Sequence, residues 1–276
     1  MLITSTRNPQ IKALRALRMR KHRARQGRYW IEGIRIVEEA LTRGAPIDTL
    51  VCAPDLLVSE RALTLLAEHE NVPRLAVSAD VFQALSERDA PMGLGAAVRI
   101  VDRSLDEIAA TDDLLVLVAY QLRTPGNLGA IIRTADAAGA SAVVVVEPTV
   151  DLYDPETVRA TMGSLYALPI VMVVEADLPP WYDALRARIL NALGLDLLVL
   201  GTSAHGDQLL YDVDCTGPLV LLIGSEQDGL PPHVRDAVDV LARLPMAGSA
   251  SSLNVSAATA AIVYEAVRQR LTRSRG

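Results

Sequence analysis

The stretch LLVLVAYQLRTPGNLGAIIRTADAAGASAVVVV (residues 114–146) decides the predicted fold class. It opens and closes with apolar, largely Val and Leu runs, 114–119 and 142–146, and the segment at about 127–138 between them has the spacing of a helix. The alternation continues toward the C-terminus, with apolar runs at 169–174, 196–200 and 219–224 and helical patterns at about 155–163, 180–192 and 252–271. Continuous apolar runs are typical of strands buried on both faces. Residues 114–276 are therefore predicted to form an α/β domain around a mostly parallel sheet.

The residues before this domain predict a second, smaller α/β domain. A helix is expected at roughly 8–26, and a further helical pattern follows at Ile34, Val37 and Leu41, with Gly44 as its stop. Short apolar runs predict strands at 49–53, 74–77 and 94–101, with helical patterns near 59–69 and 80–87 between them. The polar stretch 102–113 has room for at most one short helix. The predicted division is a domain at 1–102, a linker at 103–113 and a second domain at 114–276.

Charge is distributed unevenly along the chain. The net charge is −6, yet residues 1–35 contain ten Lys and Arg and a single acid, Glu32, which leaves +9 there and −15 in the remainder. This asymmetry indicates a nucleic-acid-facing arm on an acidic body. The alternative is an amphipathic helix with a solvated basic face, because Ile11, Leu14 and Leu17 mark one apolar stripe. The candidate RNA-binding residues are Arg7, Arg18, Arg20, Lys21, Arg23 and Arg25.

Several classes of protein are disfavoured by composition. The first ten residues contain no apolar signal region, and the longest apolar runs are too short to span a bilayer. Cys52 and Cys215 are isolated, and the four His residues have no metal-ligand spacing. A cytoplasmic protein with two buried thiols, no metal and no membrane association is the expectation.

Three polar loops are the candidate ligand site, because ligands of open parallel sheets bind beyond the carboxyl ends of the strands. The first loop (120–140) offers Asn127 as a helix N-cap, with Arg133 nearly two turns later; the second (223–232) places Glu226 between Gly224 and Gly229. The third (244–270) feeds a long helix that Ser252 or Asn254 could cap. Taken singly, each glycine also suits an ordinary turn, and Arg133 an ordinary surface position. Neither the dinucleotide fingerprint GxGxxG nor the P-loop fingerprint is present.

Together the three loops resemble the three motifs of the SpoU (TrmH-type) RNA 2′-O-ribose methyltransferases of the SPOUT superfamily. PGNLGAIIRTADAAGA resembles the first motif, LLIGSEQDGLP the second and LPMAGSASSLNVSAATAAIVYEAV the third. Further upstream, NPQIKALRALRMRKHRARQGRYWIEGIRIVEEAL and PMGLGAAV resemble the substrate-binding domain of the rRNA-modifying members. The resemblance covers nearly the whole chain.

The resemblance implies a SPOUT fold: a small N-terminal α/β RNA-binding domain and a C-terminal α/β domain with a deep trefoil knot that binds S-adenosylmethionine. By motif position, the cofactor contacts fall at Thr202, Gly224, Leu244 and Leu253, and the catalytic residues are Asn127, Arg133, Glu226, Ser252 and Asn254. It also implies a homodimer whose active site draws on both knots, and the helix at 252–271 carries Ala257, Ala260, Ala261 and Tyr264 at a spacing suited to close packing.

The implied reaction is in-line transfer of the sulfonium methyl group to a ribose 2′-hydroxyl. Holding donor and acceptor in line supplies much of the rate, on the order of 7–11 kcal/mol for well-oriented pairs. Arg133 is the family's proposed activator of the hydroxyl, but a guanidinium stays protonated in proteins. We therefore expect Arg133 to clamp the adjacent phosphate and stabilise developing alkoxide charge, with Glu226 and Asn254 orienting it and the ribose.

The N-terminal domain favours ribosomal RNA as the substrate, with tRNA as the alternative. Two other classes stay open: a non-catalytic RNA-binding or ribosome-assembly factor on the same fold, and a nucleotide-dependent oxidoreductase, which the missing GxGxxG disfavours.

Overall fold

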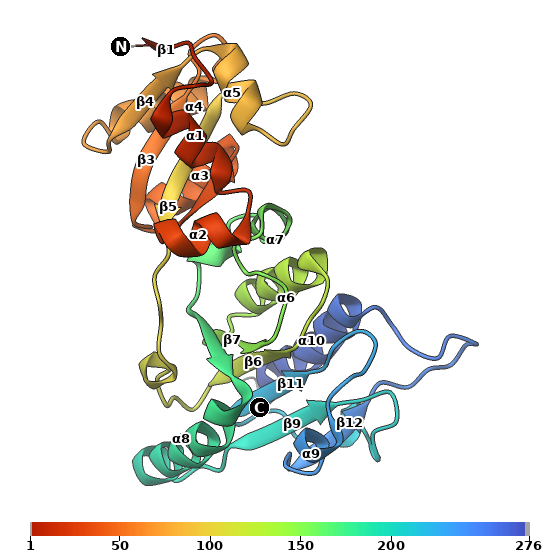
Figure 1. The fold of residues 1–276 in the computed structure, drawn as a ribbon. Coiled ribbons are helices and arrows are strands. Elements are labelled where there is room, and N and C mark those ends of the chain that lie inside the picture. Colours follow the sequence, from red (N-terminus) through yellow and green to blue (C-terminus); the bar gives the residue numbers. More distant parts are fainter. Residues whose placement is uncertain (1, 274–276) are drawn as a thin grey trace. The chain divides into compact units, whose positions relative to one another are not determined.

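The computed structural model describes residues 2–273, and the chain divides into two compact units (Figure 1). The N-terminal unit comprises Met1–Val101 and Asp151–Ala167. The second unit comprises Asp102–Val150 and Leu168–Gly276, and it is called the catalytic unit because it contains all of the expected catalytic residues. The first boundary lies between Val101 and Asp102, so segment 103–113, expected to be a linker, belongs to the second unit. Segment 151–167 also differs from the predicted division, because this segment packs with the N-terminal unit although it lies within the sequence of the predicted C-terminal domain.

The N-terminal unit is built on a five-stranded mixed sheet in the order β1-β4-β3-β5-β2. The strands are β1 (Leu2–Ile3), β2 (Arg28–Glu32), β3 (Ile47–Cys52), β4 (Arg74–Val77) and β5 (Leu94–Arg99). The helices are α1 (Pro9–Ala16), α2 (Arg20–Gln26), α3 (Ile34–Thr42), α4 (Glu60–Glu68), α5 (Ala79–Leu85) and α7 (Pro155–Ala160), and a 3-10 turn, η2 (Ser164–Tyr166), follows α7. β5 runs antiparallel to both of its neighbours, whereas β1, β3 and β4 are mutually parallel.

The single helix expected at 8–26 is wrong at its centre, where the chain forms two helices. Asn8 caps α1 by accepting from the backbone N–H of Gln10 at 2.8 Å, and Pro9 occupies the first helical position. The chain leaves α1 at Leu17, which is fully buried, and starts α2 at Arg20. Gly27, in the left-handed region with φ 60°, then ends α2 and allows β2 to follow directly.

Alternation along β2 places side chains on both faces of this sheet. Tyr29 and Ile31 belong to a cluster that also contains Val158 of α7, and Trp30 belongs to the cluster with α1 and α5 on the other face. Segment 151–167 therefore supplies part of the core of the N-terminal unit.

The catalytic unit contains a seven-stranded sheet, parallel throughout, in the order β10-β12-β9-β11-β6-β7-β8. Its strands are β6 (Leu115–Tyr120), β7 (Ala142–Glu147), β8 (Ile170–Val174), β9 (Leu198–Thr202), β10 (Gln208–Leu209), β11 (Leu219–Ile223) and β12 (Val240–Arg243). Its helices are α6 (Pro125–Ala137), α8 (Leu178–Leu193), α9 (Pro232–Arg235) and α10 (Val255–Arg273), and its 3-10 turns are η1 (Leu105–Glu107), η3 (Glu175–Asp177) and η4 (Leu210–Asp212). The five strands expected from apolar runs are all present, and η1 is the short helix for which 102–113 had room.

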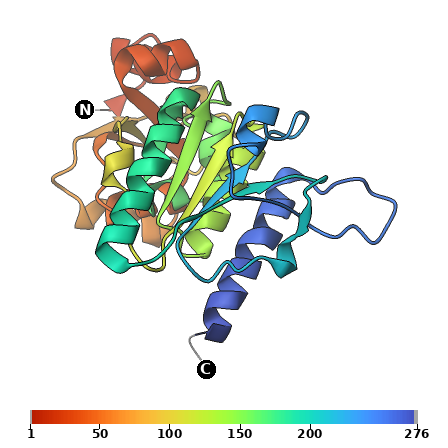
Figure 2. The same cartoon turned by 90° about the horizontal axis from the view of Figure 1, so that it is seen from below.

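Helices cover both faces of this sheet. Trp181, Leu185 and Ile189 of α8 pack on the face formed by alternate residues of β6 and β7, while α6 and α10 pack against each other. Figure 2 shows α8 and α10 on opposite sides of the strands. The parallel α/β fold is confirmed, and the trefoil knot stays a prediction.

Two further expectations concern the whole chain. Cys52 and Cys215 are both buried and free, as predicted. Among residues 2–273, no helix has the length and apolar character that crossing a bilayer requires.

Candidate active site

A cavity of about 630 Å³ lies beyond the carboxyl ends of β9, β11 and β12 in the catalytic unit. Because these three strands are parallel neighbours, their following loops meet at one edge of the sheet. The loops supply Thr202–His205, Gly224–Leu230 and Leu244–Asn254 in part, and the first turns of α10 close one side. The volume is in the range of small-molecule and cofactor sites.

Gly224 lets the second loop fold tightly against the end of β11. A Cβ at this position would lie 2.2 Å from the carbonyl carbon of Gly229 and 2.4 Å from the backbone nitrogen of Leu230. Ser225 and Gly229 also exchange backbone hydrogen bonds of 3.2 and 3.0 Å, and Gly229 has φ 65°. Only glycine fits at residue 224, so the backbone itself forms this wall of the cavity.

Three of the predicted catalytic residues form one hydrogen-bonded chain. The Nδ2 of Asn254 donates to Oδ1 of Asn127 at 3.2 Å, and Nδ2 of Asn127 donates to Oε1 of Glu226 at 2.6 Å. Each residue comes from a different loop, so this chain ties all three motifs together. Asn254 also caps α10, accepting from the backbone N–H groups of Ser256 at 3.0 Å and Ala257 at 3.4 Å, as the sequence allowed.

The expected N-cap role of Asn127 is wrong. Helix α6 begins at Pro125 with Thr124 as its N-cap residue, so Asn127 lies within the first turn. Proline suits the first helical position because its missing N–H would be unpaired there in any case. The start at Pro125 frees the Asn127 side chain to bridge Asn254 and Glu226.

Glu226 is held as a carboxylate. Burial raises its pKa, but hydrogen bonds from Asn127, from the backbone N–H groups of Glu226 and Arg123 and from the Thr124 hydroxyl outweigh burial and leave the pKa below its ordinary value. A carboxyl with a lowered pKa is a weaker base. This supports an orienting role for Glu226 rather than proton abstraction.

Arg123 is a part of this arrangement that the motif positions did not single out. Its guanidinium donates to Oε1 of Gln227 at 2.6 Å and to Oδ2 of Asp228 at 2.5 Å, and its backbone N–H donates to Oε2 of Glu226 at 3.2 Å. The loop after β6 is thereby fastened to the loop after β11. The sequence contained one usable signal: Arg123 lies between the end of β6 at Tyr120 and Pro125, the proline of the first motif.

The four predicted cofactor contacts all line the cavity, as does Ser252. Leu244 and Leu253 give apolar walls, and Thr202 donates through Oγ1 to the carbonyl of Leu222 at 2.9 Å. Its hydroxyl thus joins β9 to β11. A mixed apolar and polar cavity with a bare backbone wall at Gly224 fits a nucleoside with a charged tail. His205 and Arg235 also line the cavity and were not predicted.

Arg133 is the predicted catalytic residue that the structure does not bring to the others. It is exposed on α6 and is absent from the cavity lining, and its side chain has no hydrogen bond or ion pair with any residue in the described range 2–273. Six positions along a helix rotate a side chain by about 240° at 3.6 residues per turn, so Arg133 and Asn127 face different directions.

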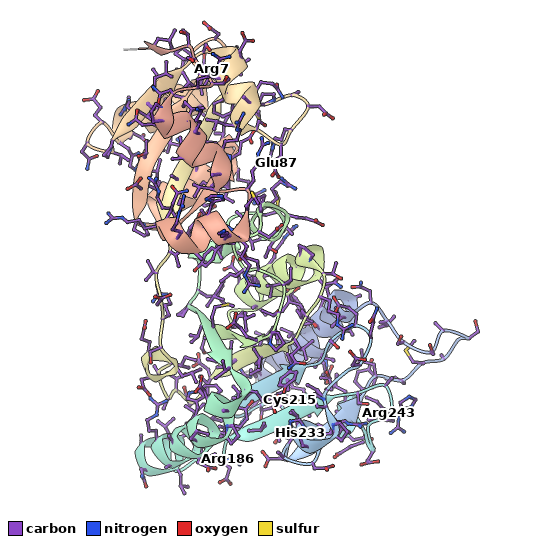
Figure 3. All side chains as sticks on the ribbon, in the orientation of Figure 1. Arg7, Glu87, Arg186, Cys215, His233 and Arg243 are labelled. Carbon is purple, nitrogen blue, oxygen red and sulfur yellow. The ribbon has the colours of Figure 1, made fainter. Side chains whose placement is uncertain are left out.

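The predicted RNA-binding residues fall into two groups. Arg7 (labelled in Figure 3), Arg20, Lys21 and Arg25 are exposed. Arg23 is wrong as an RNA contact, because its side chain is 3 % exposed and donates to the carbonyls of Leu17 and Arg18 and to Asp151 at 2.7 Å. Arg18 is also engaged, donating to the carbonyls of Ala84, Leu85 and Ser86. Both arginines hold the N-terminal unit together.

Two family models match the chain. The SpoU rRNA Methylase family matches residues 114–264, and the MRM3-like substrate binding domain matches residues 8–96. The first match contains all three loops of the cavity, and the second ends before the boundary of the two units.

Relatives match over most of their length. The 23S rRNA (uridine(2479)-2′-O)-methyltransferase of Streptomyces viridochromogenes is 38% identical over 255 residues, covering 92% of this chain and 87% of the relative. A 23S rRNA (guanosine(2553)-2′-O)-methyltransferase of Bacillus subtilis (strain 168) is 29% identical over 262 residues, covering 95% and 97%.

Solved structures agree over the same extent. The SpoU methyltransferase AviRb from Streptomyces viridochromogenes, in complex with AdoMet, has a TM-score of 0.88 at 37% identity and covers 96% of this chain and 99% of its own. An AdoMet-bound rRNA methyltransferase from Sinorhizobium meliloti has a TM-score of 0.85 at 35% identity, covering 97% of each chain. Because the family model spans more than half of the chain and a relative above 30% identity aligns over nearly all of it, the protein belongs to the SpoU rRNA methylase family.

Proposed function

We propose that the protein transfers the methyl group of S-adenosylmethionine to a ribose 2′-hydroxyl of ribosomal RNA, in the cytoplasm, where that RNA is made into ribosomes. The observation that carries this is the hydrogen-bonded chain Asn254–Asn127–Glu226 beside the 630 Å³ cavity. It places polar groups from three loops at the edge of a cofactor-sized space. Two relatives that cover both units, from Streptomyces viridochromogenes and Bacillus subtilis (strain 168), are 23S rRNA 2′-O-methyltransferases by name.

S-adenosylmethionine supplies, when bound, an electrophilic methyl group on a sulfonium centre. The chain's own residues must position the ribose and handle charge. Asn127 and Asn254 are hydrogen-bonded donors and acceptors in fixed orientations, and Glu226 keeps Asn127 fixed. Preorganised groups of this kind stabilise charge that develops in the transition state without reorganising. Arg133, always protonated, suits a phosphate next to the reacting ribose.

A homodimer is part of this proposal, because Arg133 lies outside the cavity of its own chain. In a two-fold dimer, the partner chain can supply Arg133 to the site that contains Asn254. Helix α10 has a surface for such an interface: Ala257, Ala261 and Tyr264 are exposed, while Ile262, Val263 and Ala266 face the core of the unit. Small residues allow a second helix to approach closely.

The test of the activity is transfer of isotopically labelled methyl groups to 23S rRNA, 16S rRNA and tRNA, followed by mass spectrometry of the nucleosides. A ribose-methylated nucleotide in 23S rRNA alone is the expected result. Labelled methyl groups in tRNA alone would mean that tRNA, and not ribosomal RNA, is the substrate. A chain that binds S-adenosylmethionine in calorimetry but methylates none of the three RNAs would support the non-catalytic alternative.

The shared site has its own test in mixed dimers. Arg133→Ala and Asn254→Ala variants should each be inactive. If each site takes Arg133 from one protomer and Asn254 from the other, half of the dimers in a re-equilibrated mixture are mixed and carry one intact site each. About a quarter of wild-type activity should then return. No recovery after verified subunit exchange would mean that both residues act within one chain.

A further inference from the structure

The N-terminal unit contains a cavity of its own, of about 450 Å³. It is bounded by the end of β2, the first turn of α3, the loop that follows α5 and the helix α7. All of its lining residues belong to residues 1–101 and 151–167, so it is separate from the cavity of the catalytic unit. Glu87, labelled in Figure 3, marks the loop after α5.

The walls of this cavity are mainly apolar. Trp30, Ile34 and Val158 line it, and Met92 and Met162 line it while remaining 47% and 42% exposed. Methionine is frequent at adaptable binding surfaces, because its flexible thioether side chain fits ligands of different shape. Trp30 is only 8% exposed and packs in the core, so Met92 and Met162 supply the accessible surface for a planar, partly apolar group.

Three arginines and three glutamates line the same cavity, and two of the arginines make no ion pair among the described residues. Arg35 and Arg88 are exposed, line it, and have no side-chain hydrogen bond or ion pair with any residue that the structure describes. The Arg88 guanidinium lies over the start of α3, with one nitrogen 3.4 Å from the position of a Cβ at Gly33. Arg159 is a third arginine of the lining, and its Nη1 donates to Oε2 of Glu87 at 3.0 Å.

None of the three acids that line the cavity is hydrogen-bonded or ion-paired with Arg35 or Arg88. Glu32 accepts from the Ser86 hydroxyl at 2.6 Å, and Glu38 is paired with Arg61 outside the lining. The third acid, Glu87, is the one already bonded to Arg159. Two guanidinium groups are therefore available to an anion.

The start of α3 adds to this positive field. The helix has nine residues, Gly33 provides no side-chain cap, and its first turn contains no acidic residue. The N–H groups of a first helical turn have no partner within the helix and favour a phosphate. Apolar walls, two arginines without partners and an uncapped helix thus meet in one space.

We propose that this cavity binds one unstacked nucleotide of single-stranded RNA, with the base against Met92 and Met162 beside the buried Trp30, and with the phosphate held by Arg35, Arg88 and the start of α3. The proposal rests on the proposed function in that RNA is the partner, and it adds a base-reading subsite to the N-terminal unit. Proteins that recognise RNA bind splayed-out bases on aromatic and guanidinium planes, and they bind phosphates on arginines and helix starts. The volume suits a single nucleotide.

The two tryptophans provide a direct readout. Trp30 lines the cavity and Trp181 lies in the core of the catalytic unit, and the chain has no other Trp. In a full-length Trp181→Phe background, titration with single-stranded hexauridylate should quench Trp30 emission in a saturable way. A hexamer of the same length without bases should bind at least about fivefold more weakly, since a stacked base is lost, and should leave the emission unchanged.

Arginine variants test the phosphate half of the cavity by fluorescence anisotropy of labelled hexauridylate on the otherwise wild-type chain, so they do not depend on the Trp181 substitution. Arg35→Ala combined with Arg88→Ala should weaken binding about tenfold or more. Arg99→Ala, an exposed arginine of β5 outside the cavity, is the control and should change binding less than about twofold.

Equal affinity for the two hexamers, or an equal loss from Arg99→Ala and the double variant, would overturn the nucleotide subsite. Calorimetry with S-adenosylmethionine keeps this outcome separate from the proposed function. A chain that binds the cofactor and methylates rRNA while ignoring the bases of the hexamer would refute the subsite alone. Saturable quenching by a chain that does not bind the cofactor would refute the methyltransferase proposal alone.

Discussion

Gly224→Ala should disable the cofactor cavity while leaving the rest of the fold intact. The added methyl carbon would lie 2.2 Å from the backbone of Gly229, whereas real Cβ contacts stay above 3.0 Å. The loop 225–229 must therefore move by about 0.8 Å or more, and the obstructing atoms are backbone, which has no rotamer to change. Overpacking of this kind costs roughly 1–3 kcal/mol of folding stability.

The same displacement should weaken S-adenosylmethionine binding at least about tenfold, which corresponds to about 1.4 kcal/mol. Calorimetric titration measures the affinity, and urea unfolding measures the stability of the same sample. Gly217→Ala is the matched control in the same unit, because no atom lies within 4 Å of its added Cβ and its φ is not positive. It should stay within about 0.5 kcal/mol of wild type. Wild-type cofactor affinity in Gly224→Ala would refute the assignment of this cavity.

Four further outcomes are expected. Arg133→Ala should retain cofactor affinity within about twofold, because Arg133 does not line the cavity, while methyl transfer falls at least about a hundredfold; normal turnover would remove it from the mechanism. Hydrogen bonds hold the pKa of Glu226 below its ordinary 4.5, so its carboxylate stabilises the fold above that value, and the stabilisation is lost as the pH falls through the lower folded pKa. Urea unfolding of Glu226→Gln should consequently show a smaller loss of stability than wild type between about pH 6 and pH 3, and parallel losses would contradict this. Sedimentation should show a dimer, and an active monomer would exclude the shared site. Four exposed basic residues, Lys12, Arg15, Lys21 and Arg25, can be replaced together with Gln. Each phosphate contact contributes roughly −0.7 to −0.9 to the slope of log K for RNA binding against log salt concentration, so the replacement should flatten this slope by up to about three. Parallel slopes for the variant and the wild type would exclude the basic segment as the RNA-binding element.

The sequence predicts most of the catalytic unit because its central strands are buried on both faces. Val-rich runs such as 142–146 have no amphipathic alternative, so their strand state follows from composition. β12 was missed because Val240–Arg243 is short and ends in an arginine that donates to the carbonyl of Gly206 at 2.5 Å. β12 lies between β9 and the two-residue edge strand β10, and Val240, Leu241 and Arg243 are only partly buried, so its sequence lacks the continuous apolar run of the central strands.

The candidate site was predicted by residue but not by arrangement. Motif order placed Asn127, Glu226 and Asn254 in one site, yet their hydrogen bonds depend on where α6 begins, two residues earlier than expected. For the basic N-terminal segment, the sequence predicts the charge correctly but not which of the charged side chains are exposed. Charge counts treat Arg23 and Lys21 alike, whereas folding buries the first against Asp151 and leaves the second exposed.

Segment 151–167 has a consequence for how the chain folds as it is synthesised. Domains usually fold in order as they leave the ribosome, but Val158 and its neighbours Tyr153, Leu165 and Tyr166 complete the core that includes Tyr29 and Ile31. The N-terminal unit therefore stays incomplete until residue 167 has emerged, after β6, α6 and β7 of the other unit have already been made. The two units are obliged to fold as an interleaved pair. A nascent chain stalled near residue 102 should consequently remain protease-sensitive, and one stalled well beyond residue 167 should be protected.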